Sequence, residues 1–124
     1  MTAAKRRRRS RGVTPAGVRK LAMALPGATE GTSYGTPAWK VRGKLFARLH
    51  QDGESLVLRV DFDQRDLLMQ ANPKAYFITD HYTNYEMMQV RLSAVDEGAL
   101  SELLLESWKR GASKKMIEAL EAEG

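Results

Sequence analysis

Hydrophobic positions recur with two different periods along the chain, and the change of period separates helices from strands. Apolar residues first recur at helical spacing at four positions: Val18, Leu21, Ala22 and Leu25. Thr14 is a favourable N-cap before this segment, and Pro15 suits the first helical position. Pro26-Gly27 ends the pattern. A first helix is therefore predicted directly after Thr14.

Period-two alternation follows and predicts three strands joined by tight turns. We expect these strands at about 38–41, 44–50 and 55–60. Arg42-Gly43 and Asp52-Gly53 supply the turn residues between them. Residues 28–35 are small and polar, and they fit either a loop or an irregular edge strand, because Pro37 cannot donate to a ladder.

The same alternation assigns the strand side chains to two faces of a sheet. The mainly aliphatic set is expected beneath the helices: Leu45, Ala47, Leu49, Leu56, Leu58 and Val60. The mixed and basic set is expected on the other face: Lys44, Phe46, Arg48, His50, Ser55, Val57 and Arg59. One face of an antiparallel sheet is therefore predicted to be at least partly open.

The second half of the chain continues with helical and strand patterns in turn. Helices are predicted at about 62–71 after Asp61, from Asp96 to Gly111, and at 113–122. Strands are predicted at about 75–79 and 86–92. The order is helix, three strands, helix, two strands and helix, with a short C-terminal helix. This order predicts a two-layer α+β domain over residues 13–124, with helices packed on one face of a five-stranded antiparallel sheet.

Composition agrees with one globular domain and excludes every function that requires cysteine. The 124 residues are 43% apolar and 28% charged, and they include no cysteine. Disulfides, cysteine-bound zinc and a thiol nucleophile are therefore excluded. No stretch has the length and apolarity of a membrane span, and Arg19 and Lys20 interrupt what a secretion signal would need. We expect a cytoplasmic protein that does not bind membranes.

The net charge of +5 is unevenly distributed. Six of the 20 basic residues and none of the 15 acidic ones lie in residues 1–12: Lys5, Arg6, Arg7, Arg8, Arg9 and Arg11. The remaining residues are therefore close to neutral. Residues 1–12 contain almost no large apolar side chain, so a disordered basic arm is predicted. Such an arm suits phosphate binding, and it also suits a solubilising extension or a misassigned start.

No catalytic constellation is evident in the sequence. His50 and His81 have no carboxylate at a spacing that would pair with them. Asp61 and Asp63 fit helix capping, and the segment around Gly31 lacks the lysine of a phosphate loop. We therefore expect a protein that is not an enzyme and needs no metal or cofactor.

Nucleic-acid binding has more support. Five basic residues are expected on the outer face or turns of the first three strands: Lys40, Arg42, Lys44, Arg48 and Arg59. No acidic residue lies between Gly31 and Gln51. Four further side chains are candidate contacts with a groove or ligand: Trp39, His81, Tyr82 and Tyr85. The alternative is an ordinary solvated sheet face, on which Lys and Arg are common.

Three segments together resemble the MmcQ/YjbR-like family of small bacterial proteins. They are TPAWKVRGKLFARL, FITDHYTNYEMMQVRL and LSELLLESWKRGASKKM, and the resemblance covers about residues 14–120. It implies a fold similar to secretion chaperones and a DNA-binding role through a double-wing arrangement of strands. The positions that match are Lys40, Arg42, Lys44, His81 and Tyr82. The family supplies no catalytic residues.

The sequence thus favours a DNA-binding protein that uses the arm and the basic strands for phosphate contacts. The main alternative is a protein-interaction module, chaperone-like or adaptor, that uses the open sheet face or edge. A small-ligand pocket near Trp39, Tyr82 and Tyr85 is a third hypothesis.

Overall fold

The computed structural model describes residues 12–123, so the predicted arm lies outside the described residues apart from Gly12. The helices are α2 (Pro15–Met23), α3 (Phe62–Ala71), α4 (Glu97–Lys109) and α5 (Lys114–Glu123). The strands are β1 (Ala28–Ser33), β2 (Thr36–Val41), β3 (Lys44–Leu49), β4 (Ser55–Arg59), β5 (Tyr76–Phe77) and β6 (Met87–Arg91). Two short 3₁₀ turns, η1 (Asp80–Tyr82) and η2 (Leu92–Ala94), flank β6 in the chain.

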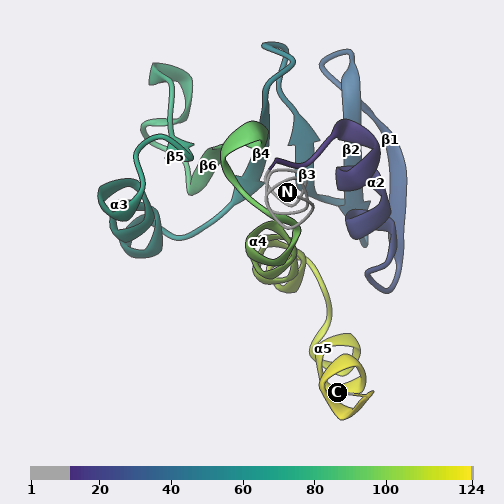
Figure 1. Ribbon diagram of the computed structural model, residues 1–124. Helices are drawn as coiled ribbons and strands as arrows, with labels where there is room; N and C mark the ends of the chain where they lie inside the picture. Colours follow the sequence, from purple (N-terminus) through teal and green to yellow (C-terminus); the bar gives the residue numbers. More distant parts are fainter. Residues whose placement is uncertain (1–11, 124) are drawn as a thin grey trace, which may run out of the picture.

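All six of these strands form one antiparallel sheet in the order β1-β2-β3-β4-β6-β5 (Figure 1). This confirms the predicted α+β class and the order of its elements. The additional strand is β1, so residues 28–33 form the edge strand that was one of two alternatives for this segment. The predicted strand at 75–79 is reduced to the two residues of β5.

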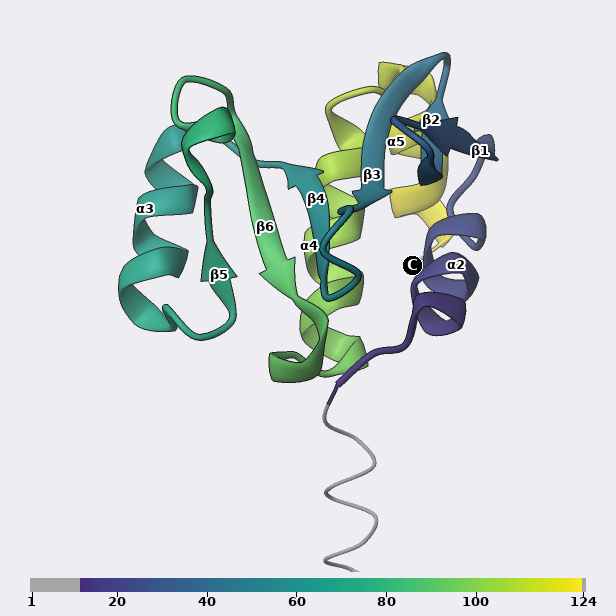
Figure 2. The ribbon, with the colours of Figure 1, turned by 90° about the horizontal axis from the view of Figure 1, so that it is seen from above.

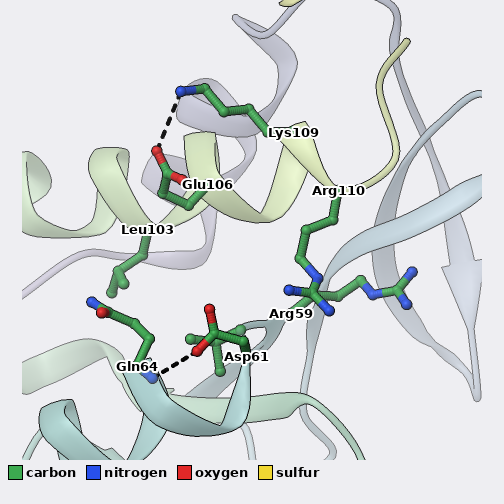
Figure 3. Close-up of a pocket in the computed structure, with 8 residues that line it drawn as sticks. Arg59, Asp61, Gln64, Leu103, Glu106, Lys109 and Arg110 are labelled. Carbon is green, nitrogen blue, oxygen red and sulfur yellow. Dashed lines mark hydrogen bonds and ion pairs between the residues drawn. The ribbon is translucent and has the colours of Figure 1, made fainter. Parts of the chain in front are cut away.

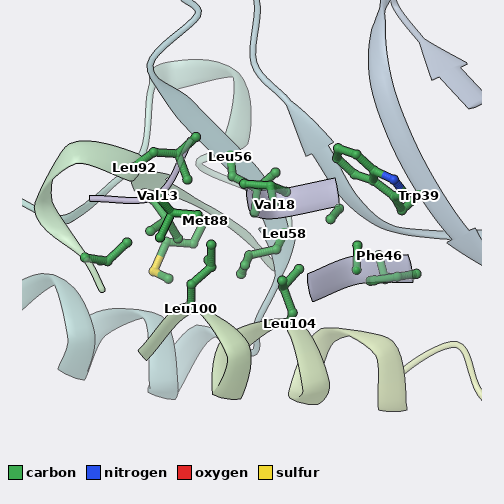
Figure 4. Packing of buried hydrophobic residues seen from close by; sticks show 14 of the residues in the cluster. Val13, Val18, Trp39, Phe46, Leu56, Leu58, Met88, Leu92, Leu100 and Leu104 are labelled. Carbon is green, nitrogen blue, oxygen red and sulfur yellow. The ribbon is translucent and has the colours of Figure 1, made fainter. Parts of the chain in front are cut away.

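The core lies between one face of the sheet and the helices. α2 and α4 contact each other across this face, and α4 also contacts β3 and β4. Figure 4 shows the packed side chains, among them Trp39, Phe46, Leu58, Leu100 and Leu104. α3 contacts β5 and β6, at the other side of the molecule from α2 (Figure 2). α5 has no fully buried residue and contributes only half-buried side chains.

Side-chain caps fix the starts of three helices. Thr14 Oγ1 accepts a hydrogen bond from Gly17 N at 3.0 Å, as predicted for a cap at that position. Asp61 and Asp96 do the same for α3 and α4 at 2.7 and 2.8 Å. No helix among residues 12–123 has the length and apolarity needed to cross a membrane.

A β-bulge in β3 overturns part of the predicted division of faces. Trp39 pairs with Ala47 and Lys40 pairs with Leu45, so Phe46 is an extra residue without a partner. Phe46 consequently joins the core at 1% exposure, and Leu45 lies on the opposite face near Arg59. The predictions that Phe46 faces outward and Leu45 inward were wrong, because one extra residue breaks the period of two.

Candidate binding surfaces

The first candidate surface is the β2–β3 hairpin. Lys40, Arg42 and Lys44 are all exposed there, as predicted. Arg42 and Gly43 have φ angles of 53° and 77°, which form the tight turn at the tip. Arg42 Nη1 donates a hydrogen bond to Gly111 O at 3.4 Å, so the hairpin lies against the connection between α4 and α5.

Two more lysines accompany this hairpin. Lys114 and Lys115 are exposed in the first turn of α5, three and four residues after Gly111. The hairpin surface is defined by these five side chains: Lys40, Arg42, Lys44, Lys114 and Lys115. Within residues 12–123 none of them has a carboxylate oxygen within 4.0 Å. The contribution of α5 was not foreseen, because only the tertiary contact at Gly111 brings the two segments together.

Arg48 belongs to a different environment from the hairpin lysines. The side chain is only 4% exposed, so the prediction that it lies on an accessible outer face was wrong. Its Nη1 donates to Thr36 Oγ1, Leu49 O and Gln51 Oε1 at 3.2–3.3 Å. Its Nη2 donates to the hydroxyl of Tyr82 at 2.7 Å. The η1 turn that carries Tyr82 therefore covers this part of the sheet.

A cavity of about 240 Å³ adjoins Arg48. Its lining consists of Tyr34, Arg48, His50, Gln51, His81 and Tyr82. The Tyr34 ring centroid lies 5.1 Å from Arg48 Cζ, and the ring itself is 78% exposed. Tyr34 lies in the β1–β2 turn, at the same end of the sheet as the β3–β4 loop (Figure 1). We call this space the Arg48 pocket. No local pattern in the sequence marks it, since its members come from three separate segments.

Polar side chains fill the rest of the sheet face that was expected to be open. Gln89 is fully buried, accepts from Thr79 N at 2.9 Å and donates to Ser55 Oγ at 3.2 Å. Ser55 Oγ in turn donates to Asp52 at 2.8 Å. Burial acts to raise the pKa of Asp52, but hydrogen bonds from Glu54 and Ser55 and the nearby His50 outweigh it and lower the pKa. The chain around Thr79 and Tyr82 thus closes much of this face.

Arg59 lies between two further cavities. One of about 420 Å³ is lined by α3 and α4 residues together with Arg59, Asp61 and Arg110 (Figure 3). The other, of about 380 Å³, adjoins Leu45, Phe62 and Tyr85 among others. Arg110 pairs with Glu86 at 2.7 Å, and Lys109 pairs with Glu106 at 3.4 Å, so acidic groups balance much of the charge around the first cavity. Arg59 itself is half-buried.

The remaining predicted contacts divide into buried and exposed groups. Trp39 is 1% exposed and its Nε1 donates to Glu30 at 3.0 Å, so it belongs to the core and not to a ligand groove. Tyr82 is buried, whereas His81 and Tyr85 are exposed. Arg6, Arg7, Arg8, Arg9 and Arg11 lie outside the described residues. Among residues 12–123 no three acidic or histidine side chains gather closely enough to hold a metal ion.

Comparison with known proteins places this fold among relatives. The family model described as YjbR matches residues 23–110. Uncharacterized proteins of Mycobacterium tuberculosis and Mycobacterium bovis are 35% identical over 52 residues, or 42% of this chain. That match spans 40% of the length of the mycobacterial proteins. The crystal structure of the Deinococcus radiodurans protein DR2400, with a DUF419 domain, has a TM-score of 0.70 and 26% identity. The structural match covers 87% of this chain and 88% of the Deinococcus radiodurans protein.

Proposed function

The chain belongs to the YjbR family, and from this premise we propose that it binds duplex DNA without catalysing a reaction. The hairpin surface and the basic N-terminal arm supply the phosphate contacts. The observation that carries the proposal is that five exposed cations of the β2–β3 hairpin and of the first turn of α5 have no carboxylate oxygen within 4.0 Å among the described residues. Lys44 lies on the face of the hairpin toward Gly111, and Lys40 lies on the opposite face, so the hairpin presents cations on both sides. Cations left unpaired in this way are available to replace the counterions of a phosphate backbone.

The position of Lys114 and Lys115 supports a role other than stability. A helix macrodipole is positive at its N-terminus, so lysines in the first turn are unfavourable for the helix itself. The first turn of α5 contains no acidic residue to offset them. The dipole and the lysines together raise the positive potential beside the hairpin, where they favour a phosphate group.

The test compares two double variants of the full chain. Lys40→Gln with Lys44→Gln removes two cations from the hairpin surface. Lys20→Gln with Lys74→Gln removes two exposed cations from α2 and from the segment before β5, and serves as the matched control. Each lost phosphate contact lowers the slope of log affinity against log salt by about 0.9. The hairpin variant is therefore expected to lower the slope for duplex DNA by about 2, and the control by much less.

Two results would contradict the proposal. One is the absence of duplex binding by the unaltered chain at about 50 mM salt, where phosphate contacts are strong. The other is an equal loss of slope in both double variants, which would assign binding to overall charge and not to the hairpin surface.

The outer edge of β1 supports the alternative function of protein interaction. Within residues 12–123, β1 pairs with β2 alone and ends the sheet, so one row of its backbone groups has no described strand beside it. Such an edge accepts an added strand from a protein partner. This binding would depend little on salt and on the hairpin lysines, which distinguishes it from DNA binding in the same experiment.

A further inference from the structure

Arg48 is a buried cation whose partners are all uncharged. Its four hydrogen bonds go to two hydroxyls, one backbone carbonyl and one side-chain amide. No carboxylate oxygen of residues 12–123 lies within 4.0 Å of it. A buried charge without a counter-charge carries a desolvation cost of several kcal/mol. An anion that reached this guanidinium would offset part of that cost.

The Arg48 pocket gives an anion the room to reach it. No acidic residue of the described part of the chain lines the cavity, since its lining is two tyrosines, two histidines, one glutamine and Arg48 itself. Asp52 is nearby in the chain, but its carboxylate accepts hydrogen bonds from Glu54 N and from the N–H and hydroxyl groups of Ser55. The guanidinium also has N–H groups left to donate to a ligand. Its Nε makes no hydrogen bond to the described residues, and Nη2, which carries two hydrogens, makes one.

The other buried arginine, Arg65, shows what a purely structural role looks like in this molecule. Its Nη1 and Nη2 donate to four backbone carbonyls, those of Tyr82, Thr83, Tyr85 and Met87, at 2.8–3.2 Å. Both terminal nitrogens of Arg65 are thus taken up by backbone carbonyls, while its buried Nε has no hydrogen-bond partner among the described residues. Arg48 has one carbonyl partner and a cavity of 240 Å³ beside it.

We propose that the Arg48 pocket binds a small anion in which a phosphate or carboxylate group is attached to one aromatic ring. A guanidinium matches either oxyanion with two parallel hydrogen bonds. Tyr34 and His81 place exposed rings at the rim, where they can contact the flat body of the ligand. The cavity suits one ring and not a polymer. Because the pocket and the hairpin surface lie at opposite ends of β3, this proposal does not depend on DNA binding.

The test titrates inorganic phosphate, phenyl phosphate and benzoate separately into the full chain and follows backbone amide shifts in the NMR spectrum. Saturable shifts are expected at Gln51 and Tyr82, with tighter binding of the two aromatic anions than of inorganic phosphate. Arg48→Lys keeps the charge but cannot donate two parallel hydrogen bonds to one oxyanion, so it is expected to weaken binding about tenfold. Arg91→Lys is the matched control, because Arg91 also stacks on a ring, that of Phe77 at 4.7 Å, but has Glu54 as a partner.

Tyr34→Asn separates the ring contact from the anion contact. Asparagine tolerates the φ of 54° at this position, so the turn is preserved. The variant is expected to weaken binding of phenyl phosphate and benzoate while inorganic phosphate binds as before. If Arg48→Lys does not fold, judged by circular dichroism, Tyr34→Asn and His81→Ala decide the matter, since both side chains are exposed.

Three outcomes overturn the proposal. The first is that none of the three probes shifts the backbone amide signals of the pocket residues at about 10 mM. That concentration would nearly saturate a site with a Kd of about 1 mM. The second is equal binding by wild type and Arg48→Lys, or by wild type and both exposed-residue variants, which assigns the anions to the basic arm. The third is that only duplex DNA shifts these residues, which joins the pocket to a nucleic-acid surface.

Discussion

Arg65 holds the segment from Tyr82 to Met87 in place through the backbone and not through side chains. The residue is 6% exposed, and its four hydrogen bonds to carbonyls tie the irregular stretch before β6, and the first residue of β6, to helix α3. The Phe62 ring lies 4.9 Å from its Cζ. The same segment carries Tyr82, which covers Arg48, so one buried arginine positions the cover of the other.

Arg65→Met is therefore expected to be strongly destabilising although it exchanges a charge for an apolar side chain of similar length. Carbonyl groups of the segment lose their donor, and hydrogen bonds to a charged group are each worth about 1.5–3 kcal/mol. We expect the free energy of unfolding, measured by urea denaturation, to fall by about 2–4 kcal/mol. Arg19→Met is the control, because the Arg19–Glu30 pair is mostly exposed. It should cost less than about 1 kcal/mol, and similar losses in both variants would contradict the assignment.

At the scale of the elements, the bulge in β3 and helix α4 are joined by one buried serine. Ser107 Oγ donates to Phe46 O at 2.6 Å and accepts from Arg59 N at 3.0 Å. It thus satisfies backbone groups of β3 and β4 from within the helix. The bulge turns Phe46 into the core without leaving its carbonyl unpaired.

This connection explains which parts of the fold the sequence predicts and which it does not. Local signals are sufficient for the caps at Thr14 and Asp96 and for the turn at Arg42, because each depends on residues close in the chain. The bulge at Phe46 depends on a helix about 60 residues later, and the burial of Arg48 depends on Tyr82. Alternation assumes an unbroken period of two, so it placed Phe46 on the wrong face. It placed Arg48 on the correct face, but it holds no information about Tyr82, which covers that residue. Tertiary contacts of this kind leave no periodic signal.

The junction between the hairpin and α4 is tight enough to be tested with one methyl group. A Cβ at Gly111 would lie 3.0 Å from Val41 Cγ1 and 3.2 Å from Lys44 Cβ. Gly111→Ala should therefore push the hairpin away and lower the free energy of unfolding by about 1–3 kcal/mol. Gly31→Ala, in β1, meets nothing within 4 Å and should change it by less than about 1 kcal/mol in either direction. Thermal or urea denaturation of both variants checks this, and an unaffected Gly111→Ala would show a looser junction.

For the whole molecule, the two sources of positive charge attach at opposite ends of α4. The described chain begins at Gly12, whose N–H donates to Val95 O at 2.7 Å just before that helix. The hairpin surface adjoins Gly111, just after the helix. Thirteen helical residues span about 20 Å. Eleven residues can extend at most about 40 Å, so their length permits contact with phosphates beyond or beside the hairpin surface.

Removal of residues 2–11 separates these two contributions. The variant keeps Gly12 and Val13, which make the first hydrogen bonds to the body, so the free energy of unfolding should change by less than about 0.5 kcal/mol. It loses six cations, and the slope of log affinity against log salt for duplex DNA should fall by up to about 5. Combined with Lys40→Gln and Lys44→Gln, the two losses should add, because each cation neutralises a phosphate of its own. A protein partner on the β1 edge should bind the shortened chain as well as the full one. If instead the shortened chain retained the full salt slope, the near-neutral body would have to supply every phosphate contact, and the hairpin surface would then be the whole site.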